Sequence, residues 1–395
     1  MPTKLAKLSP LALIVLGLLL AGGLQGYETP QTSNDSHARL PRFEVDLSWQ
    51  WPPELPNNWV VGIVTWVAVD RRDHVWVLHR PRQVPVENKD RAAPPVLEFD
   101  AAGRFVQAWG GPGAGYDWGD MEHSLSVDHQ DNVWITFHNP LERSWSAPLQ
   151  RTDDMILKFT SKGKFIRQFG GRDRHPLGVG GNTDTTSVHL ATEAVVFPKT
   201  NEVFVSDGYG NRRVLVLDAE TLAFKRMWGA FGKQPPPTLG RGVNADANIA
   251  TTTDSKGPEH FNSVHAVKLS HDGLVYVGDR SHRRIQVFTV DGKYVDQVFV
   301  NPTGKGFRTA SGIAFSADPQ QQFIYVADYE NGQLHIVDRK ALKQVGSFGK
   351  MGEKPGEFLG LHTIAVDSKG NLWTAETQPK PVGSRVQRLI FKGIS

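Results

Sequence analysis

Residues 261–288, FNSVHAVKLSHDGLVYVGDRSHRRIQVF, decide the fold, because related copies of this stretch recur along most of the 395-residue chain. Its short runs are rich in Val, Ile, Tyr and Phe, and turn residues such as Asp272 and Gly273 separate them. A two-residue apolar period broken by Asp/Gly turns indicates antiparallel β-strands and not helices. The stretch therefore predicts three consecutive strands, at residues 266–269, 274–277 and 284–288.

Alignment of this stretch with the rest of the chain gives six related units. They cover residues 61–111, 121–171, 188–232, 261–300, 309–349 and 361–394. Four short strands per unit of roughly 40 to 50 residues predict an all-β, six-bladed β-propeller. We expect one such domain from residue 43 to residue 395. The sixth unit ends after its third strand, so the isolated run FEVDLSW at residues 43–49 is expected to close the ring as the missing outer strand.

The N-terminal residues have the pattern of a secretion signal. Lys4 and Lys7 precede an apolar run at residues 11–21, and small residues follow. This pattern predicts a signal peptide over residues 1–26, a flexible lead-in over residues 27–42, and a secreted or periplasmic protein. An uncleaved N-terminal anchor is the alternative, although no stable membrane span is expected after cleavage.

The composition excludes several classes of site. The chain has no cysteine, which rules out disulfides and thiolate metal ligands. Its net charge is only +3 and no basic stripe is present, so nucleic acid is not an expected partner. The oligomeric state is left open by the sequence.

One position of the repeat carries a chemical alternation around the ring. Five residues before the first turn, the six units have Thr65, His123, Thr192, His265, Ser311 and His362. The innermost strands face the central channel, and alternate blades are related by about 120°, so the three histidines should converge on the axis. Three imidazoles with an open fourth position suit a catalytic zinc, and imidazole also suits iron. The alternative is that they line the channel and bind only water.

A second set of side chains is expected beside the histidines. The end of a second strand lies on the same rim as the start of the first, and there the units carry Arg80, His138 and Arg280. Tyr209 lies in the equivalent loop of the third unit, SDGYGNRR. Arginines near a cation can hold a carboxylate, and a phenol held near them is a usable base. Taken singly, Arg280 could instead pair with an acid, and Tyr209 could only pack beneath a turn.

Three aspartates precede equivalent loops of different units: Asp207, Asp279 and Asp328. Because aspartate side chains accept hydrogen bonds from nearby backbone N–H groups, these residues are predicted to stabilise turns and not to take part in chemistry.

With these residues assigned, the chain resembles NHL-type six-bladed propellers, and in particular the peptidyl-α-hydroxyglycine α-amidating lyase (peptidylamidoglycolate lyase) family. The resemblance covers roughly residues 60–390 and is strongest in TEAVVFPKTNEVFVSDGYGNRRV, VHAVKLS, VGDRSHRRIQVF, EHSLSVD and VWVLHR. It implies a zinc held by three histidines, and an active-site tyrosine and two arginines. The matching residues are His123, His265, His362, Tyr209, Arg80 and Arg280.

The activity that this resemblance implies is cleavage of the C–N bond of an α-hydroxyglycine, which releases glyoxylate and a terminal amide. The metal would bind the hydroxyl and Tyr209 would take its proton. Arg80 and Arg280 would bind the substrate carboxylate and keep the tyrosine acidic. The expected partner is therefore a small molecule or peptide with a free carboxylate.

Several residues depart from the family pattern. Thr363 stands where the family has an acidic ligand of a structural calcium, so calcium is doubtful, and Gly360-Leu361 replaces the methionine before the third histidine. The family's disulfide cysteines are missing, and Gly210 follows the motif tyrosine. No copper monooxygenase domain accompanies the repeats, so the substrate need not be a peptide.

Two other functions compete with the lyase. One is a non-catalytic NHL propeller that binds a protein or glycan. The other is a metal-dependent hydrolase or lactonase, which is less favoured because calcium prefers oxygen ligands to imidazole.

Overall fold

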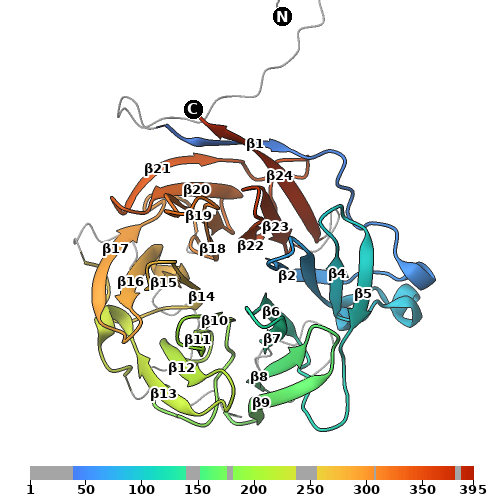
Figure 1. The fold of residues 1–395 in the computed structure, drawn as a ribbon, viewed down its shortest axis with the longest axis horizontal. Helices are drawn as coiled ribbons and strands as arrows, with labels where there is room; N and C mark the ends of the chain where they lie inside the picture. Colours follow the sequence, from blue (N-terminus) through green and yellow to red (C-terminus); the bar gives the residue numbers. More distant parts are fainter. Residues whose placement is uncertain (1–38, 139–151, 176–180, 237–255, 307, 379–383) are drawn as a thin grey trace, which may run out of the picture. The chain divides into compact units, whose positions relative to one another are not determined.

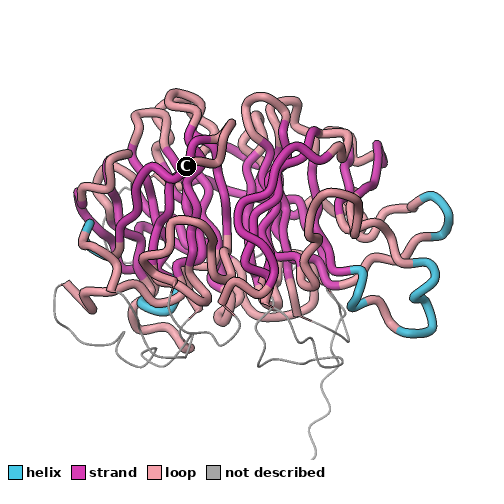
Figure 2. The backbone as a smooth tube through the Cα atoms, turned by 90° about the horizontal axis from the view of Figure 1, so that it is seen from below, coloured by secondary structure: helices cyan, strands magenta, loops and turns pink. Residues whose placement is uncertain are grey.

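The computed structural model describes residues 39–138, 152–175, 181–236, 256–306, 308–378 and 384–395. These residues form six four-stranded antiparallel sheets arranged around a central axis, which confirms the predicted six-bladed propeller (Figure 1). Seen from the side, the strands run between two rims made of turns and loops (Figure 2). The expected signal peptide at residues 1–26, and most of the lead-in at residues 27–42, lie outside the described residues.

The first three blades follow one another along the chain. Blade one contains β2 (Ile63–Val69), β3 (Val75–Arg80), β4 (Val96–Phe99) and β5 (Phe105–Trp109). Blade two contains β6 (Glu122–Val127), β7 (Asn132–Phe137), β8 (Asp153–Thr160) and β9 (Phe165–Arg172). Blade three contains β10 (Glu193–Phe197), β11 (Glu202–Asp207), β12 (Arg213–Asp218) and β13 (Phe224–Trp228). The first strand of each blade is the innermost one.

The other three blades repeat this order. Blade four contains β14 (Val264–Leu269), β15 (Leu274–Asp279), β16 (Arg284–Thr289) and β17 (Tyr294–Phe299). Blade five contains β18 (Gly312–Phe315), β19 (Phe323–Asp328), β20 (Gln333–Asp338) and β21 (Lys343–Phe348). Blade six contains β22 (Leu361–Val366), β23 (Leu372–Glu376) and β24 (Arg385–Ile394). Short 3-10 turns lie at η1 (Pro56–Asn58), η2 (Pro81–Gln83), η3 (Val86–Arg91), η4 (Ala230–Gly232) and η6 (Arg280–His282). Among the residues described, no helix is long and apolar enough to span a bilayer.

Blade six is completed by the N-terminal strand, as the repeat count predicts. Strand β1 (Pro41–Val45) pairs antiparallel with β24, on the outside of the sheet (Figure 1). The strand begins two residues before the expected run at residues 43–49 and ends four residues before its end. It ends early because the Asp46 carboxylate accepts a hydrogen bond from the backbone N–H of Ser48, which turns the chain.

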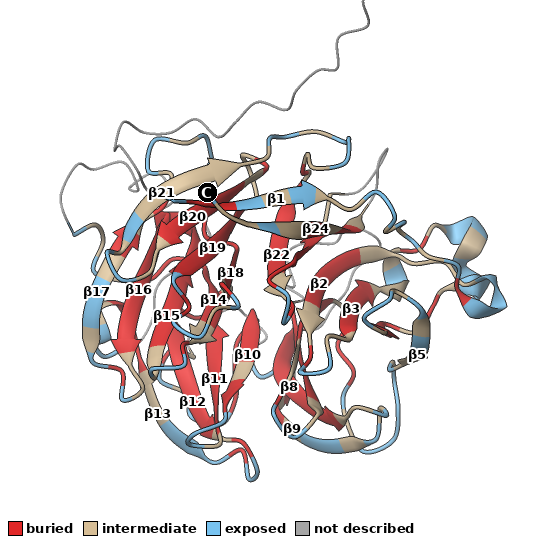
Figure 3. Ribbon diagram, turned by 45° about the horizontal axis from the view of Figure 1, so that its top comes forward, coloured by how far each residue is buried: buried red, intermediate tan, exposed pale blue. Residues whose placement is uncertain are grey.

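The apolar core consists of six clusters, each shared by two neighbouring blades. Trp134 of blade two packs with Val203 of blade three, for example, and Trp373 of blade six packs with Val77 of blade one. Burial is concentrated in the inner and middle strands, whereas most residues of the outer strands β9, β13 and β17 are intermediate or exposed (Figure 3). Because both faces of each inner strand are packed, the strand ends that face the channel are held in place.

The three predicted turn aspartates are buried and anchor their loops. Asp207 accepts hydrogen bonds from the backbone N–H of His189 and from Arg213 Nε, each at 2.9 Å. Asp279 and Asp328 have comparable sets of partners. The structural role is confirmed, but the partners include arginine and histidine side chains as well as backbone N–H groups.

Candidate metal and substrate site

A β-bulge at the repeated ring position turns each histidine toward the channel. In blade two the pairing of β6 with β7 shifts register around His123, which has no partner of its own in the ladder. The same shift surrounds His265 in β14 and His362 in β22, and also Thr65 in β2. A bulge places an extra residue in one strand and re-aims its side chain. The histidines that occur at this position in every second unit of the sequence therefore all point toward the central channel.

The structure brings the three histidines together on the axis. Their imidazole centroids lie 5.1 Å apart for His123 and His265, 5.0 Å for His123 and His362, and 4.8 Å for His265 and His362. One ring nitrogen from each lies within 4.8 Å of those of the other two, and all three residues are buried. This spacing places three ligand atoms around one point, as a single ion requires.

The hydroxyl-bearing positions of the intervening blades orient these rings through their backbone carbonyls. The Nδ1 atoms of His123, His265 and His362 lie 2.7, 2.5 and 2.7 Å from the carbonyl oxygens of Thr192, Ser311 and Thr65. A carbonyl can only accept, so each Nδ1 must carry the proton. Each Nε2 therefore carries a lone pair and no proton, so it can bind a metal or accept a hydrogen bond, and a partner that fixes the tautomer in this way is typical of metal-bound histidine.

The site keeps the imidazoles neutral. Burial, together with the nearby His362, holds the pKa of His123 well below its usual value. Burial and Arg280 do the same to the pKa of His265. Burial lowers the pKa of His362 to about 3. Neutral imidazole is the form that binds metal, so the ligand set is ready at neutral pH.

Tyr209 lies on the open side of the histidines. Its hydroxyl oxygen is 2.9 Å from His265 Nε2 and 3.4 Å from His123 Nε2. Arg280 donates from Nη1 to the same oxygen at 3.0 Å, and its guanidinium carbon lies 5.0 Å from the centroid of the phenol ring. The ring of His138 packs beside that of Tyr209, with centroids 4.0 Å apart. The phenol is thus fixed between two imidazoles and a guanidinium.

Both predicted arginines lie at this rim, Arg280 buried and Arg80 half-buried. Arg80 donates from Nε to the backbone carbonyl of Glu122 at 2.8 Å. Arg280 Nε is buried and has no hydrogen-bond partner among the described residues. Burial lowers the pKa of both guanidiniums, so an anion in contact with them would be favoured.

The loop that carries Tyr209 is held without a covalent link. Gly210 donates from its backbone N–H to the carbonyl of His189 at 3.0 Å, and a Cβ on Gly210 would lie 1.9 Å from His189 Cδ2. His189 is itself fixed to Asp154, with Nδ1 2.8 Å from the carboxylate oxygen. Glycine is required at position 210 because the imidazole of His189 occupies the space that a side chain would need.

Sequence reasoning missed three residues of this region. Trp66 lies against all three histidines, with ring centroids 5.6 to 6.3 Å away. The ring of Tyr329 lies 6.2 Å from that of His362, and the Arg308 guanidinium lies 5.5 Å from the Tyr329 ring centroid. Tyr329 could have been found, because it follows Asp328 as Arg280 follows Asp279.

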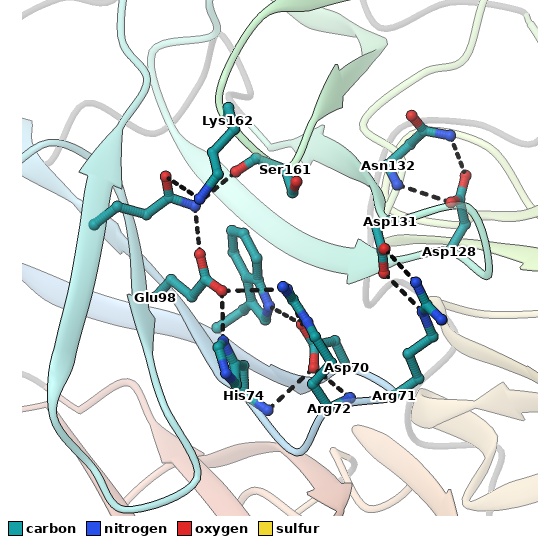
Figure 4. Close-up of polar contacts among 12 residues, drawn as sticks. Asp70, Arg71, Arg72, His74, Glu98, Asp128, Asp131, Asn132, Ser161 and Lys162 are labelled. Carbon is teal, nitrogen blue, oxygen red and sulfur yellow. Dashed lines mark hydrogen bonds and ion pairs between the residues drawn. The ribbon is translucent and has the colours of Figure 1, made fainter.

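A second group of possible ligand atoms lies on the opposite rim of the propeller, at the β2–β3 turn and in the nearby strand β4 (Figure 4). It contains Asp70, His74 and Glu98. Arg72 Nη2 donates to Asp70 at 2.7 Å and to Glu98 at 3.3 Å, and His74 Nδ1 lies 2.7 Å from Glu98. A cation from the protein already balances these carboxylates, so this group is a structural ion network.

The sequence is similar to two kinds of known protein, although no protein-family model matches it. It is 23% identical over 375 residues to peptidyl-alpha-hydroxyglycine alpha-amidating lyase 1 of Drosophila melanogaster, which covers 87% of this chain and 60% of the fly protein. It is 22% identical to a probable lyase of that name from Caenorhabditis elegans, over 82% of each chain. It is 26% identical to NHL repeat-containing protein 3 of Mus musculus, over 87% of this chain and 83% of the mouse protein.

Solved structures agree on the fold. A streptogramin B lyase superposes with a TM-score of 0.50 over 90% of this chain and 98% of its own, at 11% identity. An auxiliary nutrient binding protein from Bacteroides thetaiotaomicron also gives 0.50, over 84% of this chain and 70% of its own, at 11% identity. The chain is therefore a six-bladed β-propeller with distant sequence similarity both to the α-hydroxyglycine amidating lyases and to NHL repeat-containing proteins.

Proposed function

We propose that this chain is a metal-dependent lyase that cleaves the C–N bond of an α-hydroxyglycine-type substrate, giving an amide and glyoxylate. One observation carries the proposal. Three neutral imidazoles present Nε2 atoms to one point, and the hydroxyl of Tyr209, held by Arg280, lies at the open side of that point. Similarity to amidating lyases over most of the chain supports the same reaction.

The residues present fit a zinc ion. His123, His265 and His362 supply three neutral nitrogen ligands whose tautomers are fixed by carbonyls, and the Tyr209 side leaves a fourth position. Iron would also accept imidazole ligands. When bound, the metal would supply Lewis acidity toward the substrate hydroxyl. Calcium is not proposed, because Thr363 offers no carboxylate.

The protein's own groups account for the movement of protons and electrons. Tyr209 would take the proton of the substrate hydroxyl as general base. The electron pair of that O–H bond becomes the second bond of the aldehyde C=O of glyoxylate, the C–N bond breaks and its electron pair goes to nitrogen, and the leaving amide nitrogen takes up the proton that Tyr209 removed. Arg280, in contact with the phenol oxygen, stabilises its negative charge.

The two arginines at this rim, Arg280 buried and Arg80 half-buried, would select the carboxylate of the substrate. Arg280 has an Nε donor without a partner among the described residues, and Arg80 is held at the same rim by its Nε bond to a backbone carbonyl. A guanidinium that is already buried binds a carboxylate strongly, since no further water has to be removed from it. The substrate class is therefore an N-acyl-α-hydroxyglycine with a free carboxylate, either small or peptidic. We further propose that the protein acts outside the cytoplasm, on the basis of the signal-like N-terminus.

A second candidate is a propeller that binds a protein or glycan without catalysis. The observation that favours it is the similarity to NHL repeat-containing protein 3, which has the higher identity and covers most of the length of both chains. The two candidates differ in whether the histidines hold a metal and in whether the rim carries out chemistry.

The test is glyoxylate release from α-hydroxyhippurate by protein purified without a histidine tag. The lyase proposal predicts release that stops with a chelator and returns with zinc, and that is lost in His265→Ala. His74→Ala, which changes a histidine of the structural network, is the matched control and should keep full release. No release with metal supplied would reject the lyase and leave the binding propeller. Metal-independent release, or unchanged release in His265→Ala, would reject the three-histidine metal centre as the site of the reaction.

A further inference from the structure

One large side chain, the indole of Trp66, lies beside all three histidines. Its ring centroid lies 5.7 Å from that of His123, 6.3 Å from that of His265 and 5.6 Å from that of His362. Because these three distances are similar, the indole lies near the line that passes through the centre of the histidine triangle at right angles to it. Trp66 is 2% exposed, so the indole is packed there and does not extend into solvent.

The indole of Trp66 and the reactive side chains lie on opposite sides of the group formed by the three histidines. In the β2–β3 ladder, Arg80 pairs with Ile63 at the rim, whereas Trp66 pairs with Leu78, further along the strand. Tyr209, in the loop after β11, contacts the Nε2 atoms from the rim side. The three histidines therefore lie between an apolar side, formed by Trp66, and a polar side at the rim, where Tyr209 and Arg80 lie. The Trp66 side is called the floor of the site below.

Only the first unit has a large aromatic residue, Trp66, directly after the ring position. In the other five units the residue after the ring position is Ser124, Glu193, Ala266, Gly312 or Thr363. Four of these are small. The Glu193 carboxylate turns to blade four, where it accepts from the backbone N–H of Val267 at 2.9 Å and pairs with Lys268.

The inner strands of blades five and six pack closely at this level. A Cβ on Gly312 would lie 2.8 Å from the Cα of Thr363 in the neighbouring blade, so a large side chain cannot be accommodated at position 312. The small residues at this position in four of the other units leave space for the one indole. Six equivalent tryptophans could not be accommodated, which explains why the repeat breaks its symmetry at this position.

We infer that Trp66 is a positioning residue that seals the channel and limits an ion held by the three histidines to one open coordination position, on the Tyr209 side. The inference rests on the metal site of the proposed function but not on the lyase reaction. An indole has no ligand atom to offer and excludes water from its side of the ion. It also packs against all three rings, so it restrains their rotation. A four-coordinate ion with one exchangeable position is the form that metal catalysis uses.

Cobalt is the probe that tests this inference. Co²⁺ absorbs visible light strongly when four-coordinate and weakly when water raises its coordination number. Wild-type protein loaded with Co²⁺ alone should give the strong spectrum. Trp66→Ala should give the weak spectrum and bind Co²⁺ at least ~10-fold less tightly in competition with a chelator, as happens at metal sites when a residue that holds a ligand in place is lost. Trp66→Phe should stay close to wild type, because it keeps an aromatic floor.

Fluorescence provides a second measurement that does not need the alanine variant to fold. Co²⁺ should quench the emission of Trp66 because the ion would lie next to it. Trp66→Phe should therefore lose much of the quenching, whereas Trp109→Phe, in outer strand β5, should not. An unchanged cobalt spectrum and affinity in Trp66→Ala, or equal quenching in the two phenylalanine variants, would overturn the inference. Absence of glyoxylate release together with the expected cobalt results would reject the lyase alone.

Discussion

Two groups of possible ligand residues lie on opposite rims of the propeller, and they differ in where their positive charge comes from. At the β2–β3 turn, Asp70 and, from the nearby strand β4, Glu98 surround the guanidinium of Arg72. In the channel, none of the described residues forms an ion pair with His123, His265 or His362, and each histidine donates its Nδ1 proton away from the centre. The first group is complete in itself, whereas the second presents three lone pairs to one point.

Electrostatics separate the groups in the same way. Although burial acts to raise it, hydrogen bonds from Arg72 and Trp76 hold the pKa of Asp70 below its usual value, so the carboxylate stays charged. Burial lowers the pKa values of the channel histidines, so they stay neutral. Proximity of ligand-type side chains is thus a poor guide to a metal site. The decisive features are the direction of the lone pairs and the absence of a cation from the protein among them.

Removal of one channel histidine should have the largest effect. In His265→Ala, bound metal should fall from about one per chain to near zero, because a three-ligand site cannot hold zinc tightly with two. Glyoxylate release should fall by more than ~100-fold, beyond the loss seen when only an outer-shell partner of a ligand is changed. Elemental analysis and the glyoxylate assay check this. The comparison breaks if His74→Ala causes the same loss.

Removal of the phenol hydroxyl should impair the reaction without emptying the site. Tyr209→Phe should lower kcat by about 10²- to 10⁴-fold, the usual contribution of a general base, with metal content and KM little changed. Steady-state kinetics on α-hydroxyhippurate measure this. Tyr116→Phe is the control, because that hydroxyl only donates to the carbonyl of Gly111 at 3.0 Å. A wild-type kcat in Tyr209→Phe would exclude the tyrosine as base.

Asp153 is a buried carboxylate that differs from Asp70 and Glu98, because no cationic side chain among the described residues forms a hydrogen bond with it. Asp153 accepts from the backbone N–H groups of Asp120 and Met121, and burial raises its pKa to about 8. A carboxyl whose pKa is raised by folding favours the folded state below its unfolded pKa, and this contribution is lost as the pH rises toward 8. The free energy of unfolding should fall between about pH 4 and pH 8, by at most ~1.4 kcal/mol per pH unit from this group.

Asp153→Asn tests that slope directly. The amide oxygen can still accept both backbone hydrogen bonds, but the side chain no longer titrates. Urea unfolding from pH 5 to pH 8 should show a smaller decline in the variant than in the wild type. Equal declines would mean that Asp153 is not the responsible group.

Loss of the arginine from the structural network should have the smallest effect. Arg72 is 43% exposed at its side chain, so water would replace part of its contact with Asp70 and Glu98. Arg72→Met should lower the free energy of unfolding by about 1 kcal/mol, as for partly exposed ion pairs. Metal content and glyoxylate release should stay at wild-type values. A loss of metal in this variant would show that the two groups are coupled.

The repeat predicts the fold and the meeting of the histidines, because a ring converts equivalent sequence positions into equivalent positions in space. His123, His265 and His362 could therefore be found by counting from the turn. Their partners could not, because a backbone carbonyl such as that of Thr192 has no signature in the sequence. The closing strand was predicted, but its end at Val45 depends on the local hydrogen bond of Asp46.

The role of Trp66 could not be predicted from the sequence for a different reason. Trp66 is an apolar residue in a strand, and nothing in the sequence separates it from core residues such as Trp76. Its role emerges only when the three histidine rings are seen around it. Tyr329 was within reach of the sequence, since the aspartate that precedes it aligns with Asp279.

The most direct test of the metal site is X-ray absorption at the zinc edge of the zinc-loaded, untagged protein. We predict three imidazole nitrogens at about 2.0 to 2.1 Å and one further light atom, with the imidazole signal lost in His265→Ala and kept in His74→Ala. A shell dominated by carboxylate oxygens, or an imidazole signal that survives His265→Ala, would show that the channel histidines do not form the site.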